Sequence, residues 1–389
     1  MVRLLVAMGQ SVLLASYTHS AVDTILLKLN EKDDTKFLRL GRQSRIDERL
    51  LHRSAEAISE KINDLDELRQ VYSSCPVIAT TCLGLNHPAI QQRTFDFCIL
   101  DEAGQSTFLS ALGPLFHASK FILVGDPKQL PPVVQSMKAR NLGFEKSLFS
   151  HLTKESNTIP LNVQYRMNSC VMACANELVY EGKLEAGSDE VANRTLSIST
   201  DSNDNLSPWM EKVLSDDLAD SVLFFDTSQL SALEVVDAHG VTNPTESKIV
   251  SFICLQLQHR GLSSSNIGAI APYRAQVNLL RQNLANISID VKTVDQFQGR
   301  DKEVIIYSCT RSKSNPSKLQ EVSSSNAPDI LADLRRLNVA VTRAKCKLIL
   351  IGNRETLIAY EETFGKLLQI LSKTRHIIPI LPNDLGIIV

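Results

Sequence analysis

The chain has 389 residues, of which 43% are hydrophobic and 22% charged, and its formal net charge is −2. This length leaves room for two or three domains, and the composition excludes collagen-like and disordered proteins. The near-neutral charge means that any nucleic-acid binding must come from a local groove. No apolar run of the sequence reaches membrane-spanning length. Among eight scattered cysteines only Cys170 and Cys174 stand close together, which favours a reduced intracellular protein over a zinc or disulfide protein.

Apolar runs typical of buried strands alternate with helical patterns along the chain. After the end of a helix in the first ten residues, strands are predicted for 11–17, 36–41, 76–81, 97–103 and 120–126, and again for 221–227, 267–273, 289–295, 303–309 and 346–352. Helices are predicted between most of them, for example over Ser20–Asn30, Arg45–Tyr72, Asn243–Arg260 and Arg274–Asn286. Such alternation predicts parallel α/β units. Two separated sets predict two domains, 1–152 and 153–389, with a polar surface insertion or flexible loop at 187–220 and a second polar loop at 312–329.

Two adjacent acids, Asp101 and Glu102, end the apolar run FCIL. Asp126, Lys128 and Gln129 follow the next predicted strand, and neighbouring parallel strands end at one crevice. Carboxylates there suit Mg²⁺ together with substrate phosphates, a second acid can deprotonate an attacking water, and the Gln129 amide can contact a terminal phosphate. A solvated turn is the alternative interpretation of the two acids, and the run GDPKQLPP one strand later argues against it.

Two arginines stand in apolar settings. Arg166 follows an apolar strand in LNVQYRMN, and Arg343 is predicted on a short helix before a strand in RLNVAVTRAK. A lone arginine is usually a solvated surface charge, whereas two in such settings are better explained as forked donors to phosphate oxygens. Arginines supplied across a domain boundary would stabilise phosphoryl transfer. The sequence therefore predicts a nucleotide cleft between the two domains.

The motifs DEAGQ, GDPKQLPP, QYRM, VDQFQGRDKEVIIYS and RRLNVAVTRAK occur in this order. The series resembles that of the superfamily 1 helicases, in the branch that holds the nonsense-mediated-decay RNA helicases and the eukaryotic replication helicase/nucleases. The resemblance covers residues 11 to about 355, and the wording of 16–29 and of the last motif is most similar to the DNA replication ATP-dependent helicase/nucleases. It implies a P-loop NTPase fold with two RecA-like parallel-sheet domains, the first truncated at its N-terminus.

The resemblance also implies an activity. The chain would be the helicase motor region of an ATP-dependent DNA helicase/nuclease of replication and repair, which couples ATP hydrolysis to translocation on single-stranded DNA. The implied cofactors are ATP and Mg²⁺, and the implied partners are single-stranded or flapped DNA, replication proteins and single-strand-binding proteins, without a membrane. The implied location is the nucleus, with the mitochondrion as a second possibility.

Site roles follow from the matched motifs. Asp101 would hold Mg²⁺ through its waters, Glu102 would be the catalytic base, and Gln129 would sense the γ-phosphate beside Arg166 and Arg343 of the second domain. The further nucleotide-binding positions are Gln105, Asp126, Tyr165, which would stack on the adenine, and the turn formed by Gly299 to Asp301. The matched nucleic-acid positions are Thr18, His19, Thr81, Pro272, Tyr273, Thr293 and Asp295. For the threonines, β-branched filling of strand ends is the alternative, and for His19 a position near a helix N-cap.

A phosphate-cradling loop of the form G-x-x-x-x-G-K-[ST] does not occur in this sequence. The Gly–Lys pairs, Gly182–Lys183 and Gly365–Lys366, stand in other contexts. We expect the chain to start within the helix after such a loop, and the nuclease domain with its iron–sulfur cysteines to lie only in a missing upstream region. Three interpretations stay open: a fragment or truncated gene model of a DNA helicase/nuclease that is inactive alone, an RNA helicase of the decay type, and a catalytically inactive nucleic-acid-binding module.

Overall fold

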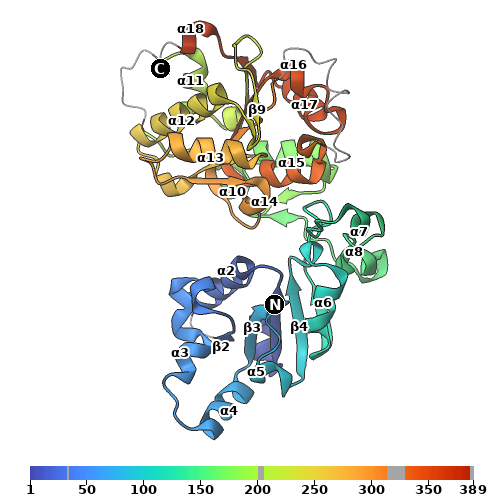
Figure 1. The fold of residues 1–389 in the computed structure, drawn as a ribbon. Helices are drawn as coiled ribbons and strands as arrows, with labels where there is room; N and C mark the ends of the chain where they lie inside the picture. Colours follow the sequence, from blue (N-terminus) through green and yellow to red (C-terminus); the bar gives the residue numbers. More distant parts are fainter. Residues whose placement is uncertain (33–34, 200–205, 313–328, 386–389) are drawn as a thin grey trace. The chain divides into compact units, whose positions relative to one another are not determined.

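The computed structural model describes residues 1–32, 35–199, 206–312 and 329–385. It divides into two compact units, Met1–Ile159 and Pro160–Val389. The sequence placed the division after residue 152. Each unit is described by itself below, and Figure 1 shows the labelled elements of both.

The first unit is built on a five-stranded parallel sheet. Its strands are β1 Val12–Ser16, β2 Phe37–Arg39, β3 Val77–Thr81, β4 Phe95–Asp101 and β5 Ala118–Leu123, in the order β2-β3-β1-β4-β5. All five predicted strands are confirmed. The three central strands carry continuous apolar runs because helices pack on both of their faces, whereas edge strand β5 leaves Phe121 half exposed.

The helices of the first unit are α1 Val2–Ala7, α2 His19–Asn30, α3 Ala55–Ser59, α4 Leu65–Ser74, α5 Pro88–Gln91, α6 Phe108–Leu115, α7 Met137–Asn141 and α8 Leu148–Leu152. Short 3₁₀ helices lie at Gln43–Arg45, Glu48–Arg53, Ala103–Gln105 and Glu155–Asn157. A continuous helix over Arg45–Tyr72 is wrong. The Ser54 and Asp64 side chains accept backbone N–H groups as N-caps, so each begins a new helix within the charged stretch.

The second unit is built on a six-stranded parallel sheet. Its strands are β8 Val222–Asp226, β11 Ile267–Ala271, β12 Asp290–Thr293, β13 Lys302–Ser308, β14 Ala344–Gly352 and β15 Ile377–Pro379, in the order β12-β11-β13-β14-β8-β15. The five predicted strands are confirmed, and β15 was not predicted. Two small sheets accompany it, the parallel pair β6 Val163–Gln164 and β7 Glu185–Ala186 and the antiparallel hairpin β9 Val235–Asp237 and β10 Gly240–Thr242.

The helices of the second unit are α9 Ser169–Ala175, α10 Asp189–Ala192, α11 Pro208–Leu214, α12 Pro244–His259, α13 Arg274–Asn283, α14 Val294–Phe297, α15 Leu334–Val341, α16 Arg354–Leu357, α17 Lys366–Lys373 and α18 Pro382–Leu385. Single π-helical segments occupy Asn176–Tyr180 and Glu361–Gly365, and 3₁₀ turns Leu218–Ser221, Ser264–Asn266 and Ile330–Ala332. Alternate strand residues serve the two faces of the sheet. Phe225 packs with the core of α11, α12 and α13, while the Tyr307 ring lies tilted against Phe364 beside α17, with 6.1 Å between centroids.

The stretch 187–220 is not a surface insertion throughout. Its helix α11 buries Trp209 and Val213 in the main core, and the Trp209 ring meets Phe225 edge-on with 5.4 Å between centroids. The ammonium group of buried Lys347 donates to the backbone carbonyls of Lys212, Val213 and Ser215 at the end of α11. Residues 200–205 of this stretch, and 313–328 of the second polar loop, lie outside the described residues.

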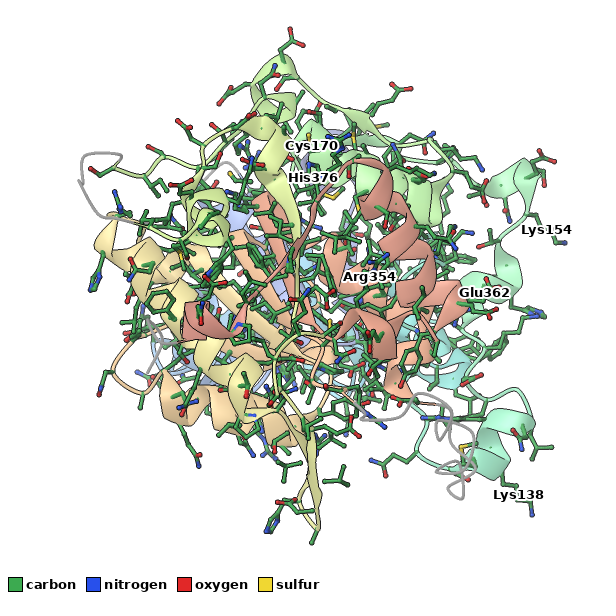
Figure 2. All side chains as sticks on the ribbon, turned by 90° about the horizontal axis from the view of Figure 1, so that it is seen from above. Lys138, Lys154, Cys170, Arg354, Glu362 and His376 are labelled. Atoms are coloured by element: carbon green, nitrogen blue, oxygen red, sulfur yellow. The ribbon has the colours of Figure 1, made fainter. Side chains whose placement is uncertain are left out.

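The cysteines form no disulfides, and the helices of the described residues are short or polar. All eight cysteines are free, and Cys170, which is labelled in Figure 2, is half-buried on α9 one turn from the buried Cys174. Within the ranges that the structure describes, no helix combines the length and apolar character that crossing a membrane requires.

Candidate nucleotide and nucleic-acid site

The acidic pair lies where the sequence predicts, at the carboxyl end of β4. Asp101 is the last residue of the strand, and Glu102 takes a left-handed conformation with φ of 50° as the chain turns into a 3₁₀ segment. The Gln105 amide donates to Glu102 Oε2 at 2.7 Å. A left-handed backbone is costly for glutamate and has to be held by its surroundings. Gln105 therefore fixes the carboxylate that this sharp turn presents.

The loops that follow β4 and β5 lie against each other, as expected for neighbouring parallel strands. The Ala103 amide donates to the Val124 carbonyl at 2.8 Å. A Cβ atom on Gly125 would lie 3.0 Å from the Gly104 amide nitrogen, so only glycine fits there without a shift. Beyond this contact, the Gln129 amide donates to Asp126 Oδ2 at 3.0 Å. The structure therefore brings together the acids of the first loop and the polar residues of the second.

The surroundings of Asp101 disfavour its ionised form. Burial, and then the neighbouring Glu102 carboxylate, raise the pKa of Asp101 to about 6. Ser16 is its register neighbour on β1, and the buried Ser16 hydroxyl has no hydrogen-bond partner among the described residues. A half-buried carboxylate beside an unused hydroxyl fits a hydrated divalent cation, whose charge would restore the ionised form.

The two predicted arginines converge within the second unit. Arg166 Nη1 donates to the Thr342 carbonyl at 3.1 Å, and Arg166 Nε lies 3.4 Å from Asp301 Oδ2. Arg343 is not on a helix: it follows α15 in the turn before β14, because the helix already ends at Val341. Its buried guanidinium donates to the carbonyls of Val339 and Arg300, so it lies against the turn formed by Gly299 to Asp301.

Asp301 is the negative centre of this cluster. Burial opposes its ionisation, but the Lys345 ammonium at 2.7 Å and then Arg166 bring the pKa of Asp301 below its ordinary value. The buried Arg166 Nε therefore faces a carboxylate in an ion pair, without the geometry of a hydrogen bond. Arg166, Lys345 and the neighbouring Arg343 outnumber the single Asp301 carboxylate, and such an excess of cations fits an oxyanion such as a phosphate.

Tyr165 presents its ring to solvent next to Arg166. The side chain is 67% exposed, which is unusual for a large aromatic residue. A Cβ atom at Gly187 would lie 2.2 Å from the ring, so the ring rests directly on the glycine backbone after β7. An exposed aromatic plane supported from behind can accept a flat ligand such as a purine base.

In the first unit, the predicted nucleic-acid residues lie at the carboxyl ends of β1 and β3. Thr18 is the N-cap of α2 and accepts the Ala21 amide, and His19 is the first residue of that helix. His19 Nδ1 lies 3.0 Å from Nη2 of Arg39. Thr81 ends β3 and is buried, which is also what β-branched filling of a strand end predicts.

In the second unit, the predicted nucleic-acid residues surround the start of α13. Pro272 is buried, while the half-buried Tyr273 bonds through its hydroxyl to Asp329. Thr293 lines a pocket of about 300 Å³ together with the arginines at 274 and 281. Asp295 forms an ion pair with Arg336 at 3.3 Å. Two exposed arginines beside a threonine are a chemistry that suits phosphate groups.

Sequence reasoning missed the residues that hold these positions. Arg39 and Asp23 form a buried ion pair behind His19, and Arg311 and Asp329 form a partly buried one beside Tyr273. Arg39 stands inside an apolar strand, where a charged residue requires a partner, and this signal could have identified it. Of the two Gly–Lys pairs, the second has Gly365 within continuous helix and Lys366 donating to the Leu178 carbonyl.

The chain matches known families along most of its length. Two family models described as AAA domain match residues 47–137 and 144–355. The chain is 44% identical over 373 residues to the DNA replication ATP-dependent helicase/nuclease DNA2 of Mus musculus, and 42% identical over 395 residues to that of Homo sapiens. These matches cover 92% and 97% of this chain. The helicase/nuclease JHS1 of Arabidopsis thaliana is 39% identical over 99% of this chain.

The chain spans about a third of the length of these relatives, 34% of the mouse protein and 36% of the human one. Among solved structures, Arterivirus nonstructural protein 10 (helicase) is similar with a TM-score of 0.45 and 14% identity, over 90% of this chain and 55% of that chain. One AAA domain model alone matches more than half of the 389 residues. The chain therefore belongs to the AAA domain family, with strong homology to the DNA replication ATP-dependent helicase/nucleases.

Proposed function

We propose that this chain is the helicase motor region of an ATP-dependent DNA helicase/nuclease that acts in DNA replication and repair. The observation that carries the proposal is the cluster at the end of β4, where Asp101, Glu102 and Gln105 meet the loop of Asp126 and Gln129. Carboxylates and amides at the carboxyl edge of a parallel sheet are what metal-assisted phosphoryl transfer needs. Sequence identity of 42–44% to two DNA replication ATP-dependent helicase/nucleases supports the same proposal.

Each unit supplies a different part of the chemistry. In the first, Glu102 accepts a proton from the attacking water, and Gln129 contacts the terminal phosphate. In the second, Arg166 and Arg343 neutralise charge that develops on that phosphate. Tyr165 offers a ring for the adenine, and the turn of Gly299 to Asp301 borders the nucleotide. Bond cleavage by a positioned base and fixed cations requires no covalent intermediate.

Mg²⁺ fits the first-unit cluster as a cofactor of ATP. Asp101 would hold it through water, and the Ser16 hydroxyl of the neighbouring strand, which has no hydrogen-bond partner among the described residues, would be a second polar group beside it. The described residues contain no group of three or more His, Cys, Asp or Glu side chains that could cage a metal. A single carboxylate that relies on nucleotide oxygens and water for the other ligands is typical of magnesium. Bound there, the cation would offset charge on the β- and γ-phosphates.

The proposed substrate track is one strand of DNA. Thr18, His19 and Thr81 would contact it in the first unit, and Pro272, Tyr273, Thr293 and Asp295 in the second. Hydroxyls, ring faces and flanking arginines bind a backbone without reading its sequence, which suits translocation. We further propose a nuclear location and flapped DNA as a substrate form, with replication and single-strand-binding proteins as partners.

The ATP part is tested in a protein that joins this chain to a phosphate-loop segment. Glu102→Gln keeps the side-chain shape but removes the base, so DNA-stimulated ATP hydrolysis should fall by about 10²–10⁴-fold while nucleotide affinity is retained. Arg335→Ala, which removes an exposed arginine of α15, is the matched control and should leave the rate unchanged. Equal turnover in Glu102→Gln and the unmodified protein would refute the role of Glu102.

The polymer preference is tested with this chain itself. Labelled single strands of DNA and RNA of identical sequence are titrated, and anisotropy gives both dissociation constants. We expect binding to DNA that weakens as salt is raised, because each neutralised phosphate releases counterions. Clearly tighter binding to RNA would favour the decay-type helicase instead.

A further inference from the structure

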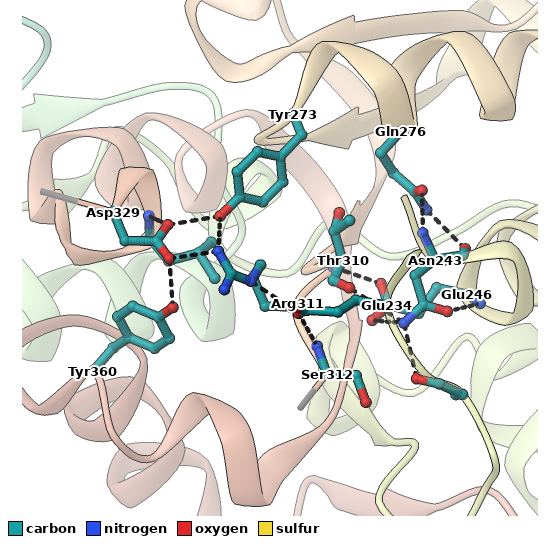
Figure 3. A network of polar contacts seen from close by, with 12 residues as sticks. Glu234, Asn243, Glu246, Tyr273, Gln276, Thr310, Arg311, Ser312, Asp329 and Tyr360 are labelled. Atoms are coloured by element: carbon teal, nitrogen blue, oxygen red, sulfur yellow. Dashed lines mark hydrogen bonds and ion pairs between the residues drawn. The ribbon is translucent and has the colours of Figure 1, made fainter. Parts of the chain in front are cut away.

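Tyr273 stands in a hydrogen-bonded cluster outside the nucleotide chemistry (Figure 3). Its hydroxyl donates to Asp329 Oδ1 at 2.6 Å, and Arg311 Nη1 lies 3.4 Å from the same hydroxyl. Arg311 Nη1 also donates to Asp329 Oδ2 at 2.8 Å, and the Tyr360 hydroxyl donates to that oxygen at 2.7 Å. One carboxylate therefore joins two tyrosines and an arginine from separate elements. The Tyr273 hydroxyl thus donates its proton to Asp329 and accepts a hydrogen bond from Arg311.

The Arg311 guanidinium is itself neutralised and fixed. Its Nε donates to Glu234 at 2.9 Å, and the same carboxylate oxygen accepts the Ser312 amide at 2.9 Å. The side chains of Arg311 and Glu234 are only 12% and 9% exposed. The guanidinium carbon lies 6.0 Å from the centroid of the Tyr273 ring. With two carboxylate partners, Arg311 is a structural cation rather than a phosphate ligand.

The backbone before Arg311 is held in a strained form that aims its side chain. Thr310 has a φ of 71°, which is rare for a β-branched residue. Its amide donates to Glu246 Oε2 at 2.8 Å, and its carbonyl accepts the Asn243 amide at 3.2 Å. Glu246 is fully buried, so this contact cannot be exchanged for water. Strain that buried partners enforce is a sign of a fixed functional geometry.

We propose that Asp329 and Arg311 are positioning residues that lock the ring of Tyr273 for contact with a single strand. The inference rests on the proposed function, which takes Tyr273 as a strand contact. Because the hydroxyl is committed within the protein, the aromatic ring is the part left to meet a base or sugar. A ring fixed before binding loses less conformational entropy on binding than a mobile one. Asp329 and Arg311 then act on DNA only through Tyr273.

The test is a double-mutant cycle on the affinity of this chain for a single-stranded DNA oligonucleotide. Tyr273→Ala should weaken binding by about 5–150-fold, the range for loss of one base–aromatic stack. Asp329→Ala should weaken binding about two- to tenfold, because the freed Tyr273 side chain must then be immobilised when the strand binds. Asp329→Asn keeps an acceptor oxygen and should fall between Asp329→Ala and the unmodified chain. In the Tyr273→Ala background, Asp329→Ala should add nothing.

Two comparisons separate positioning from general structural damage. Tyr360→Phe removes one other hydrogen bond to Asp329 but leaves both contacts to the Tyr273 hydroxyl, and it should keep DNA affinity within about twofold. Arg311→Ala should weaken binding without changing the slope of log affinity against log salt, because Arg311 neutralises no phosphate. Additive losses in the cycle, or a salt slope reduced by Arg311→Ala, would overturn the proposal.

A readout without DNA separates this inference from the proposed function. The sequence has seven tyrosines, so ¹³C labelling at tyrosine Cζ gives few signals, and Tyr273→Phe identifies one of them. Asp329→Ala should shift the Tyr273 signal and speed its ring flips. If that signal is unmoved, the positioning role is wrong, whatever the DNA result. If it moves but the unmodified chain binds no single strand, the lock on the ring is upheld and the proposed function fails.

Discussion

The guanidinium of Arg39 holds the imidazole of His19 through a contact of 3.0 Å between Nη2 and Nδ1. Arginine has no acceptor, so Nδ1 must accept, and the proton of neutral His19 is therefore on Nε2. Arg39 is fully buried and paired with Asp23 at 2.7 Å. In both units, then, an Arg–Asp pair holds the ring side chain of a predicted strand-contact motif, His19 in one and Tyr273 in the other.

His19 should remain a neutral Nε2–H donor at neutral pH. Burial and then Arg39 lower the pKa of His19 from its ordinary 6.5, against the opposing charge of Asp23, while Arg45 lowers it further. Because the folded value is below the unfolded one, this group favours the folded state above pH 6.5, and the contribution is lost as pH falls through the folded value. We expect ¹⁵N shifts of the Nε2–H tautomer and titration below 6.5. A protonated Nδ1 at pH 7.5 would contradict the assignment.

The buried carboxyl of Glu246 should make stability depend on pH. Burial raises the pKa of Glu246 to about 8, although hydrogen bonds from Ser308 and Thr310 oppose the rise. The folded value exceeds the unfolded 4.5, so this group stabilises the fold fully below 4.5 and loses that effect as pH rises through 8. Glu246→Gln should remove this slope, which is at most about 1.4 kcal/mol per pH unit for one proton.

Urea unfolding at pH 5, 6, 7 and 8 measures this difference between variant and unmodified chain. Glu362→Gln, at an exposed position labelled in Figure 2, is the matched control and should leave the slope unchanged. Parallel pH profiles for Glu246→Gln and the unmodified chain would show that Glu246 is already ionised in the fold.

The contact between the two motif loops of the first unit should depend on Gly125. Gly125→Ala places a Cβ atom 3.0 Å from the Gly104 backbone, so we expect a loss of about 1–3 kcal/mol in the free energy of unfolding. Gly104→Ala is the control, because its Cβ atom would meet only the Asp126 carbonyl at an ordinary 3.5 Å. Thermal and urea unfolding of both variants tests this, and equal stability would mean that the loops separate readily.

Residues 1–389 by themselves should show no DNA-stimulated ATP hydrolysis. Without a phosphate loop, ATP loses the backbone N–H cradle and the lysine on its β- and γ-phosphates. Three lost charge-assisted bonds of about 1.5 kcal/mol each already weaken binding by about a thousandfold. Phosphate release with and without single-stranded DNA measures this. Turnover above background that Arg343→Ala abolishes would contradict the expectation and show a self-sufficient motor.

Local patterns in the sequence determined the two sheets and the positions of the motifs. The ten apolar runs became strands because each is long enough to bury, and the pattern of residues placed Asp101 at the end of its strand and Asp126 after the next one. The helix predicted over 45–72 failed because the N-caps at Ser54 and Asp64 outweighed its amphipathic pattern. The α11 core helix was missed because its few apolar residues stand in a polar stretch, and their burial depends on a sheet formed elsewhere.

Only the tertiary structure decided which side chains became partners. Tyr273 meets Asp329 across 56 residues of sequence, and Arg311 meets Glu234 across 77. In the second sheet the strand order is β12-β11-β13-β14-β8-β15, so the neighbouring pairs β11–β13, β14–β8 and β8–β15 are not consecutive in the chain. The separation of two such residues along the chain does not predict their distance in space. That distance is set by the connections between strands, which bring remote segments together. The sequence thus determined which residues can do chemistry. The tertiary structure decided that the pair Arg39–Asp23 holds His19 and that the pair Arg311–Asp329 holds Tyr273.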